Sequence, residues 1–327
     1  MSDEVVTPGQ APRAVGVRAP WEAVPAGLRA AVEGHLDARI VAAETQLGGF
    51  SPGVAARLRL AGGRRAFVKA VSAAQNPDSP RIHRSEARVA RALPSQVPAP
   101  RLLADFDRDG WVVLLFEDIE GRTPAQPWRP AELARVMSVV GDLAAVLTPS
   151  PVDVPPVTES HAGSFHNWRD IAAAHAAGTD DLAGLDPWAV GHLGALAELE
   201  AGWAAGAAGD TLAHGDLRAD NLLLTPDGRV VVVDWPWASR AARWFDLLLM
   251  LPSVRMQGGP PPQQLFDAHE VAAGADPDAV TAVLAAFAGY LLGSARLPAP
   301  PGLPTLRPFQ AAQGVAALEW LRSRTGG

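Results

Sequence analysis

The pattern of apolar residues changes near residue 121, and this change constrains the fold more than any other feature of the sequence. Before it, the runs Val54–Leu60 and Ala66–Val71 flank a turn with two glycines, which predicts an antiparallel β-hairpin. After it, the alanine- and leucine-rich segments 130–147, 189–208 and 280–292 have helical periodicity. The sequence therefore predicts an α+β fold, in which a small antiparallel sheet precedes a larger, mainly helical part.

The strand-rich part is predicted to hold one helix and two further strands. Residues 81–93 have amphipathic helical spacing, and the prolines that follow end this helix. Strands are expected around 102–106 and over the apolar run Trp111–Phe116. The predicted organisation is a flexible leader over residues 1–25, a first lobe over 26–116, a hinge over 117–123 and a helical lobe over 124–327.

Composition and charge exclude several classes of protein. The chain has no cysteine, so disulfides, thiolate zinc sites and cysteine nucleophiles are ruled out. Its 28 Lys and Arg against 35 Asp and Glu give a net charge of −7, which disfavours nucleic acid and anionic membranes as partners. The uncharged stretch 279–295 is shorter than the ~20 residues of a membrane span and is expected to be a buried helix. A cytoplasmic protein is expected, either a monomer or a homodimer.

One segment of the helical part carries most of the candidate chemistry. The motif His214–Asn221 precedes a predicted hairpin, whose turn is Pro226–Gly228, and Asp234 follows that hairpin. Because a hairpin folds its two ends together, Asp216, Asn221 and Asp234 are expected to converge. Two carboxylates and an amide at one place suit a divalent metal ion with a bound nucleotide. Taken singly, each residue has an ordinary alternative as a turn cap or a strand end.

The Asp-x-x-x-x-Asn spacing of this motif matches the catalytic loop of protein kinases. Its His-Gly-Asp opening resembles the aminoglycoside phosphotransferase family and the related choline, homoserine and macrolide kinases. The resemblance implies a protein-kinase-like fold of two lobes, with ATP and Mg²⁺ as cofactors. It also implies that Asp216 is the catalytic base and that Asn221 and Asp234 bind the magnesium. Arg218 stands where relatives often have histidine, and this departure leaves the three residues intact.

The first lobe supplies candidates for nucleotide binding. Lys69 interrupts an apolar strand, and with Glu86 it resembles the ion pair that orients the α- and β-phosphates in kinase-like enzymes. The alternative is a lysine at the edge of the sheet and a glutamate on the surface. In the loop 48–53, Ser51 and Gly53 are candidate phosphate contacts. An ordinary turn has the same composition, and the loop matches neither Gly-x-Gly-x-x-Gly nor a P-loop.

Residues at the lobe boundary and around the motif complete the candidate site. The resemblance implies that the backbone near Glu117 and Ile119, in the hinge, contacts adenine. His214 is interpreted as a structural histidine bonded to the backbone, because no second histidine stands at ligand spacing. Asp246 matches an aspartate of the family and is expected either to cap a helix or to support the catalytic loop.

The function implied by the resemblance is ATP-dependent phosphorylation of a hydroxyl on a small molecule. An aminoglycoside or related antibiotic, with a role in resistance, is the first hypothesis. A metabolite kinase acting on choline, homoserine, a sugar or a macrolide is the alternative, and the sequence separates the two poorly. A nucleotide-binding pseudokinase would be expected to lack one of the catalytic candidates, all of which are present. Nucleotidyl transfer on the same scaffold also stays open.

Overall fold

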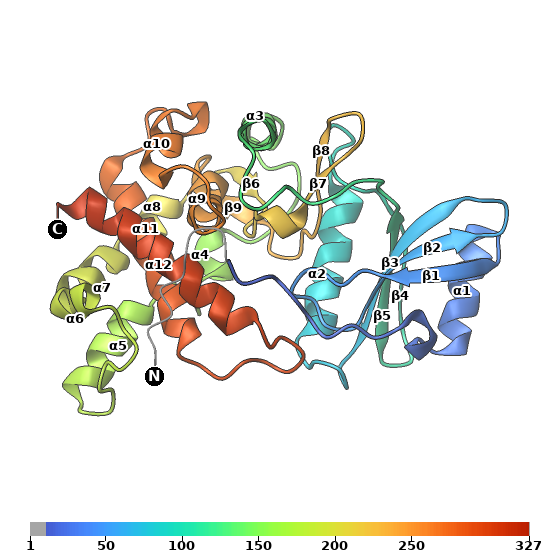
Figure 1. Ribbon diagram of the computed structural model, residues 1–327, viewed down its shortest axis with the longest axis horizontal. Coiled ribbons are helices and arrows are strands. Elements are labelled where there is room, and N and C mark those ends of the chain that lie inside the picture. Colours follow the sequence, from blue (N-terminus) through green and yellow to red (C-terminus); the bar gives the residue numbers. More distant parts are fainter. Residues whose placement is uncertain (1–10, 327) are drawn as a thin grey trace.

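The computed structural model describes residues 11–326 and shows a sheet-containing lobe beside a mainly helical lobe (Figure 1). The first lobe is built on a five-stranded antiparallel sheet in the order β1-β2-β3-β5-β4. Its strands are β1 (Ile40–Thr45), β2 (Val54–Leu60), β3 (Arg65–Ser72), β4 (Leu102–Arg108) and β5 (Trp111–Glu117). The predicted hairpin is formed by β2 and β3, and the predicted fold class is confirmed.

Helices cover both faces of this sheet. The predicted helix is α2 (Ser79–Ala92), which clusters with Val112, Leu114 and Phe116 of β5. The opposite face is covered by α1 (Ala26–Leu36), which clusters with Val113 and Leu115, the β5 residues that alternate with those three. Because successive side chains of a strand point to opposite faces, burial on both sides explains the continuous apolar run of β5. The sequence predicted α2 but not α1.

The segment before α1 is packed against the first lobe. The predicted flexible leader, residues 1–25, lies partly outside the described residues. Within the described part, the backbone of Val15 and Arg18 forms bridges to the loop between β1 and β2, residues 46–53, called here the glycine loop. Trp21, in the 3-10 helix η1 (Trp21–Ala23), is buried in the core of the sheet. Backbone pairing and a buried indole therefore anchor this part of the segment, where the prolines had predicted a loose leader.

The second lobe is mainly helical, as predicted. The helix expected over 189–208 is divided into three short helices, because glycines at 191 and 202 interrupt it. The α-helices of this lobe are α3 (Pro130–Val146), α4 (Val157–Ser160), α5 (Asn167–Ala176), α6 (Pro187–Gly191), α7 (Leu193–Ala201), α8 (Trp203–Ala207), α9 (Phe245–Met256), α10 (Pro262–Asp267), α11 (Pro277–Ala295) and α12 (Leu306–Thr325). Two 3-10 helices are η2 (Ala219–Asn221) and η3 (Glu270–Ala272).

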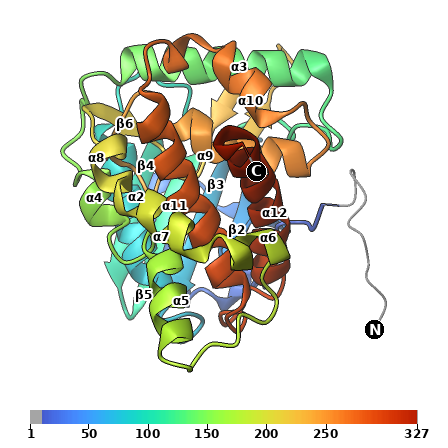
Figure 2. The same ribbon diagram turned by 90° about the vertical axis from the view of Figure 1, so that its left-hand side faces the viewer.

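Figure 2 shows α11 between α12 on one side and α7 and α8 on the other. Among the helices of residues 11–326, α11 alone is long and apolar enough to cross a membrane. However, 61% of its most apolar window is buried inside the fold. A helix that is apolar on most sides and surrounded by other helices is typical of the core of a large domain, as the sequence predicted.

Two small sheets lie in the helical lobe, close to the first lobe (Figure 1). β6 (Thr211–Ala213) pairs with β9 (Ser239–Ala241). β7 (Leu222–Leu224) pairs with β8 (Val230–Val232), which is the second predicted hairpin. The loop between β6 and β7 carries the His214–Asn221 motif, and the chain after β8 leads to Asp234.

Candidate active site

The β7–β8 hairpin folds the two halves of the motif together. Its ladder ends at the pair Leu222↔Val232. One step beyond, the Val233 N–H donates to the Asn221 carbonyl oxygen at 3.0 Å. This contact places Asn221 beside the strand end that carries Asp234, so the structure brings together the residues whose convergence the spacing predicted.

A buried scaffold holds the start of the motif. Asp246, in the first turn of α9, accepts hydrogen bonds from the N–H groups of His214 (2.7 Å) and Gly215 (2.9 Å). Nε2 of His214 lies 3.0 Å from the Val233 carbonyl oxygen, and Nδ1 accepts from the Asp216 N–H at 3.2 Å. Burial lowers the pKa of His214, although Asp246 opposes this. A neutral His214 therefore bonds backbone on both sides, as predicted, and Asp246 supports the loop.

Gly215 meets a steric requirement of this scaffold. Its φ is +79°, a left-handed value that L side chains rarely adopt. A Cβ at this position would lie 2.7 Å from the Trp237 carbonyl oxygen. Glycine is therefore the residue that lets the loop turn toward Asp216.

Asn221 holds Asp216 from one side. Its Nδ2 donates to the backbone oxygen of Asp216 at 2.8 Å and to Asp216 Oδ2 at 3.3 Å. The amide oxygen Oδ1 of Asn221 receives no hydrogen bond from residues 11–326. Burial raises the pKa of Asp216 to about 7, with Arg218 opposing the shift. A carboxylate with a pKa near neutrality is suited to accepting a proton.

Arg218 holds Asp216 from the other side. Its Nη1 donates to Asp216 Oδ1, while Nε and Nη2 donate to the carboxylate of Asp220 at 3.1 and 3.0 Å. The guanidinium also lies 5.4 Å from the ring centroids of Phe50, in the glycine loop, and Phe309, on α12. Arg218 is thus paired with aspartates and lies beside two aromatic rings, one from each lobe, whose centroids are 5.1 Å apart.

An ion-pair cluster joins the two lobes. Lys69 Nζ, on β3, lies 2.6 Å from Glu86 Oε1 on α2 and 2.8 Å from Asp234 Oδ1. Burial lowers the pKa of Lys69, but the two carboxylates outweigh it and raise the pKa above its ordinary value. Burial raises the pKa of Glu86 to about 7 against the opposing charge of Lys69. Since β3 lies inside the sheet, the alternative of a solvated edge lysine does not hold.

Asp234 has an unusual backbone and a free carboxylate oxygen. Its φ of 70° is rare for a residue other than glycine and costs about 1 kcal/mol or more. Burial raises the pKa of Asp234, but Lys69 outweighs it and lowers the pKa to about 2, so the carboxylate stays ionised. Oδ1 accepts from Lys69, whereas Oδ2 accepts no hydrogen bond within residues 11–326.

The unbonded side-chain oxygens of Asn221 and Asp234 fit a magnesium ion that is shared with a phosphate. No group of three or more His, Cys, Asp and Glu side chains within the described chain is placed to hold a metal by itself. Asn221 Oδ1 and Asp234 Oδ2 offer two hard oxygen ligands. Magnesium usually binds through one or two carboxylates plus substrate phosphates and water, so a small donor set of this kind is suitable.

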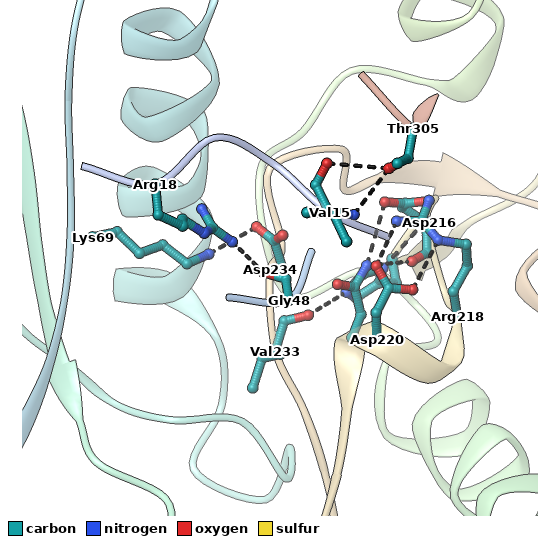
Figure 3. Close-up of polar contacts among 12 residues, drawn as sticks. Val15, Arg18, Gly48, Lys69, Asp216, Arg218, Asp220, Val233, Asp234 and Thr305 are labelled. Carbon is teal, nitrogen blue, oxygen red and sulfur yellow. Dashed lines mark hydrogen bonds and ion pairs between the residues drawn. The ribbon is translucent and has the colours of Figure 1, made fainter. Parts of the chain in front are cut away.

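A cleft between the lobes leads to this cluster. Its walls include apolar side chains of both lobes, among them Phe67, Phe116, Leu223 and Val233, and its lining includes the charged cluster. Figure 3 shows the charged end, where Lys69 reaches toward Asp234. Apolar walls with a few polar groups suit a flat heterocycle that carries an anionic group.

The cleft contains most of the residues predicted for nucleotide binding, namely Lys69, Glu86, Ser51, Glu117 and Ile119. The Ile119 carbonyl oxygen accepts from Arg57 Nη2 at 2.9 Å, whereas its N–H donates no hydrogen bond within residues 11–326. Asp118, next to it, is buried between Arg57 (3.2 Å) and Arg65 (3.1 Å). The hinge is therefore fixed to the sheet by these charges.

Gly53, predicted to contact phosphate, is not part of the cleft wall. Its N–H donates to the Val17 carbonyl oxygen at 3.3 Å, and its own carbonyl oxygen accepts from the Ala19 N–H at 2.9 Å. Its φ is +94°, and a Cβ there would lie 2.6 Å from the Ala70 carbonyl oxygen. The close approach of β3 explains this glycine, and the prediction for Gly53 is corrected accordingly.

One residue that sequence reasoning missed also lines the cleft: Arg18. It comes from the N-terminal segment that was expected to be loose. The alternation of Val15, Val17 and Ala19 is the signal of a short strand that could have indicated pairing with the glycine loop.

The two lobes and the cleft between them are typical of the protein-kinase-like fold. The phosphotransferase enzyme family (APH) matches residues 48–317, and the chain belongs to this family. No curated protein matches the sequence significantly.

Solved structures with a similar fold include two kinds of small-molecule kinase. One is a thermostable mutant of the aminoglycoside phosphotransferase APH(4)-Ia, in ternary complex with AMP-PNP and hygromycin B, with 15% identity, a TM-score of 0.59 and coverage of 92% of this chain and 100% of that one. Another is choline kinase LicA from Streptococcus pneumoniae, with 12% identity, a TM-score of 0.58 and coverage of 90% and 98%. At such identities the likeness establishes the fold, which is the predicted protein-kinase-like one.

Proposed function

We propose that this protein transfers the γ-phosphate of ATP to a hydroxyl of a small molecule, in the cytoplasm, with an aminoglycoside or related antibiotic as acceptor. The Lys69–Glu86–Asp234 cluster at the end of the cleft carries this proposal. Taking an ammonium and two carboxylates out of water is costly, and apolar residues would stabilise the same place as well or better. Binding of a charged ligand by this cluster accounts for the presence of these three charged side chains where apolar residues would be at least as stable.

The nucleotide is proposed to lie along the cleft. Its adenine would pack between the apolar walls and bond the hinge backbone near Glu117 and Ile119, and Ser51 would face the phosphates. Lys69, held in place by Glu86, would donate to the α- and β-phosphates. Membership of the phosphotransferase enzyme family supports this placement.

Magnesium would be held by Asn221 Oδ1 and Asp234 Oδ2, together with phosphate oxygens. When bound, the ion neutralises charge on the transferring phosphoryl group. Both side chains keep a free oxygen for this task, since their hydrogen bonds use Nδ2 of Asn221 and Oδ1 of Asp234.

Asp216 is proposed as the catalytic base. As the acceptor hydroxyl forms its bond to the γ-phosphorus, the bond from that phosphorus to the ADP oxygen breaks, and the hydroxyl proton passes to the Asp216 carboxylate. Arg218 and Asn221 hold one carboxylate oxygen each, so the side chain is oriented before the acceptor binds.

The acceptor would bind on the helical lobe. A second cavity there is lined by α5, the loop 180–186, α11 and α12, and carries the exposed carboxylates of Asp170 and Glu319 beside Arg296 and Arg322. The hygromycin B complex of the similar APH(4)-Ia structure supports an antibiotic as acceptor. The likeness to LicA equally supports the alternative of a metabolite kinase acting on choline, homoserine, a sugar or a macrolide.

Magnesium-dependent ATP consumption by the purified protein, measured across aminoglycosides, macrolides, choline, homoserine and sugars, tests the proposal. Strong stimulation by an aminoglycoside is expected. Stimulation by choline or homoserine alone would favour the metabolite kinase. Failure to bind ATP under any of these conditions would rule out the proposed function.

A further inference from the structure

The N-terminal segment, residues 14–19, lies between the glycine loop and the helical lobe. On one side, the Gly49 N–H donates to the Ala14 carbonyl oxygen at 3.0 Å, and Ala19 pairs with Gly53 at 2.9 Å. On the other side, the Val17 N–H donates to the Gly302 carbonyl oxygen at 2.8 Å. Val15 exchanges two 3.1 Å hydrogen bonds with Oγ1 of Thr305, and Figure 3 shows this pair beside Asp216. The segment therefore bridges the two lobes and fixes the position of Arg18 in the wall of the cleft.

The side chain of Arg18 lies against the inner face of the glycine loop. Nε donates to the Gln46 carbonyl oxygen at 3.1 Å, Nη1 to that of Ser51 and Nη2 to that of Gly48. The loop thus presents three carbonyl oxygens at this point. Carbonyl oxygens repel phosphate, whereas a kinase loop over a nucleotide needs donors or positive charge there. The guanidinium reverses the polarity of this surface.

Arg18 also keeps donors for a further ligand. A guanidinium has five N–H groups, and the three carbonyl contacts use three of them. No carboxylate oxygen of residues 11–326 lies within 4.0 Å of the Arg18 guanidinium, although Lys69 and Asp234 line the same cleft. Figure 3 shows Arg18 and Lys69 both directed toward Asp234. Asp234 is thus near Arg18 but forms no ion pair with it, and a half-buried cation without an ion-pair partner is expected to take an anionic ligand.

We propose that Arg18 is a further phosphate-binding residue of the nucleotide site, delivered by the N-terminal segment to a glycine loop that has no cationic residue of its own. The inference rests on the proposed function, since it requires a nucleotide in the cleft. The two remaining N–H groups donate to the β- and γ-phosphate oxygens, opposite Lys69. The nucleoside part of the ligand makes no contact with Arg18.

The test compares Arg18→Gln with wild-type protein by calorimetric titration of adenosine, AMP, ADP and AMP-PNP in the presence of magnesium. Arg29→Gln is the matched control, because Arg29 also donates to a backbone carbonyl oxygen, that of Val24 at 3.0 Å, but does not line the cleft. Arg18→Gln is expected to weaken ADP and AMP-PNP binding by about 10- to 100-fold, the range for lost charge-assisted hydrogen bonds, and to leave adenosine within about twofold. Arg29→Gln is expected to leave the whole series unchanged.

Two results would overturn the inference. An equal loss for adenosine and AMP-PNP would show that Arg18 only shapes the loop. Tighter AMP-PNP binding by the variant would show that Arg18 obstructs the phosphate site. Wild-type protein that binds none of the nucleotides would instead overturn the proposed function, and this inference with it. If Arg18→Gln does not fold, Arg18→Lys replaces it, with AMP-PNP binding expected to be weaker than in wild-type protein while adenosine binding is kept.

Discussion

Replacing Lys69 by methionine should reduce stability by an amount that depends on pH. The substitution leaves Glu86 and Asp234, which lie 2.6 and 2.8 Å from Nζ, without their shared cation. Removal of one partner from a buried ion pair costs about 3–5 kcal/mol. We expect a loss of this size in the free energy of unfolding near pH 8.

The loss should become smaller in mild acid. Burial raises the pKa of Glu86 to about 7 even though the charge of Lys69 lowers it. Without Lys69 this opposing charge is lost, and the pKa of Glu86 rises further. In the Lys69→Met variant the pKa of Asp234 also rises from its wild-type value of about 2, because Lys69 is the cation that lowers it. Carboxylates with a raised pKa bind more protons in the folded than in the unfolded protein. The destabilisation that they cause in the folded variant therefore grows as pH rises above about 4.5, the ordinary pKa of a carboxyl group, and is absent well below that pH. Near pH 5 we therefore expect a smaller loss than near pH 8.

Urea denaturation of wild-type and Lys69→Met protein at the two pH values measures this difference. Arg84→Met is the control, because Arg84 pairs with Asp107 at 2.6 Å on the surface, where such pairs contribute about 0–1 kcal/mol. A loss below about 1 kcal/mol near pH 8, or an equal loss at both pH values, would refute the reasoning.

Three other substitutions test the site. Asp246→Ala leaves the N–H groups of His214 and Gly215 without their acceptor and should lower the free energy of unfolding by about 2–4 kcal/mol, measured by urea denaturation. Gly215→Ala should cost at least about 1 kcal/mol in the same assay, because of its φ of +79° and the 2.7 Å approach of a Cβ to the Trp237 carbonyl oxygen. Asp234→Ala should remove the magnesium dependence of ATP binding, measured by titration with and without the metal; an unchanged dependence would contradict its proposed role.

The sequence predicts those parts of the molecule that depend on neighbours along the chain. The hairpin between β2 and β3 and the hairpin between β7 and β8 follow from alternation and turn residues. The convergence of Asn221 and Asp234 follows from the second hairpin. The apolar strand indicates that Lys69 needs a partner, and the resemblance to kinase-like enzymes implies that this partner is Glu86.

Contacts between distant segments were beyond this reasoning. Arg18 contacts carbonyl oxygens about 30 residues away, and its segment pairs with Gly302, so alternation along the segment can indicate an extended chain but does not place Arg18 in the cleft. Arg218 lies beside the rings of Phe50 and Phe309, which come from opposite ends of the chain. Gly53 was predicted to contact phosphate from the position of its loop, whereas its packing against β3 is a tertiary contact that the sequence does not show. Such features depend on how the lobes meet, which periodicity does not encode.

The most direct test of the central claim is the mass of the acceptor after incubation with ATP, magnesium and either wild-type or Asp216→Ala protein, with ATP binding measured in parallel. We expect wild-type protein to add a single phosphate, and the variant to bind ATP nearly as well but to add none. Addition of a nucleotide by wild-type protein, or full turnover by Asp216→Ala, would show that the proposed phosphotransfer by Asp216 is wrong.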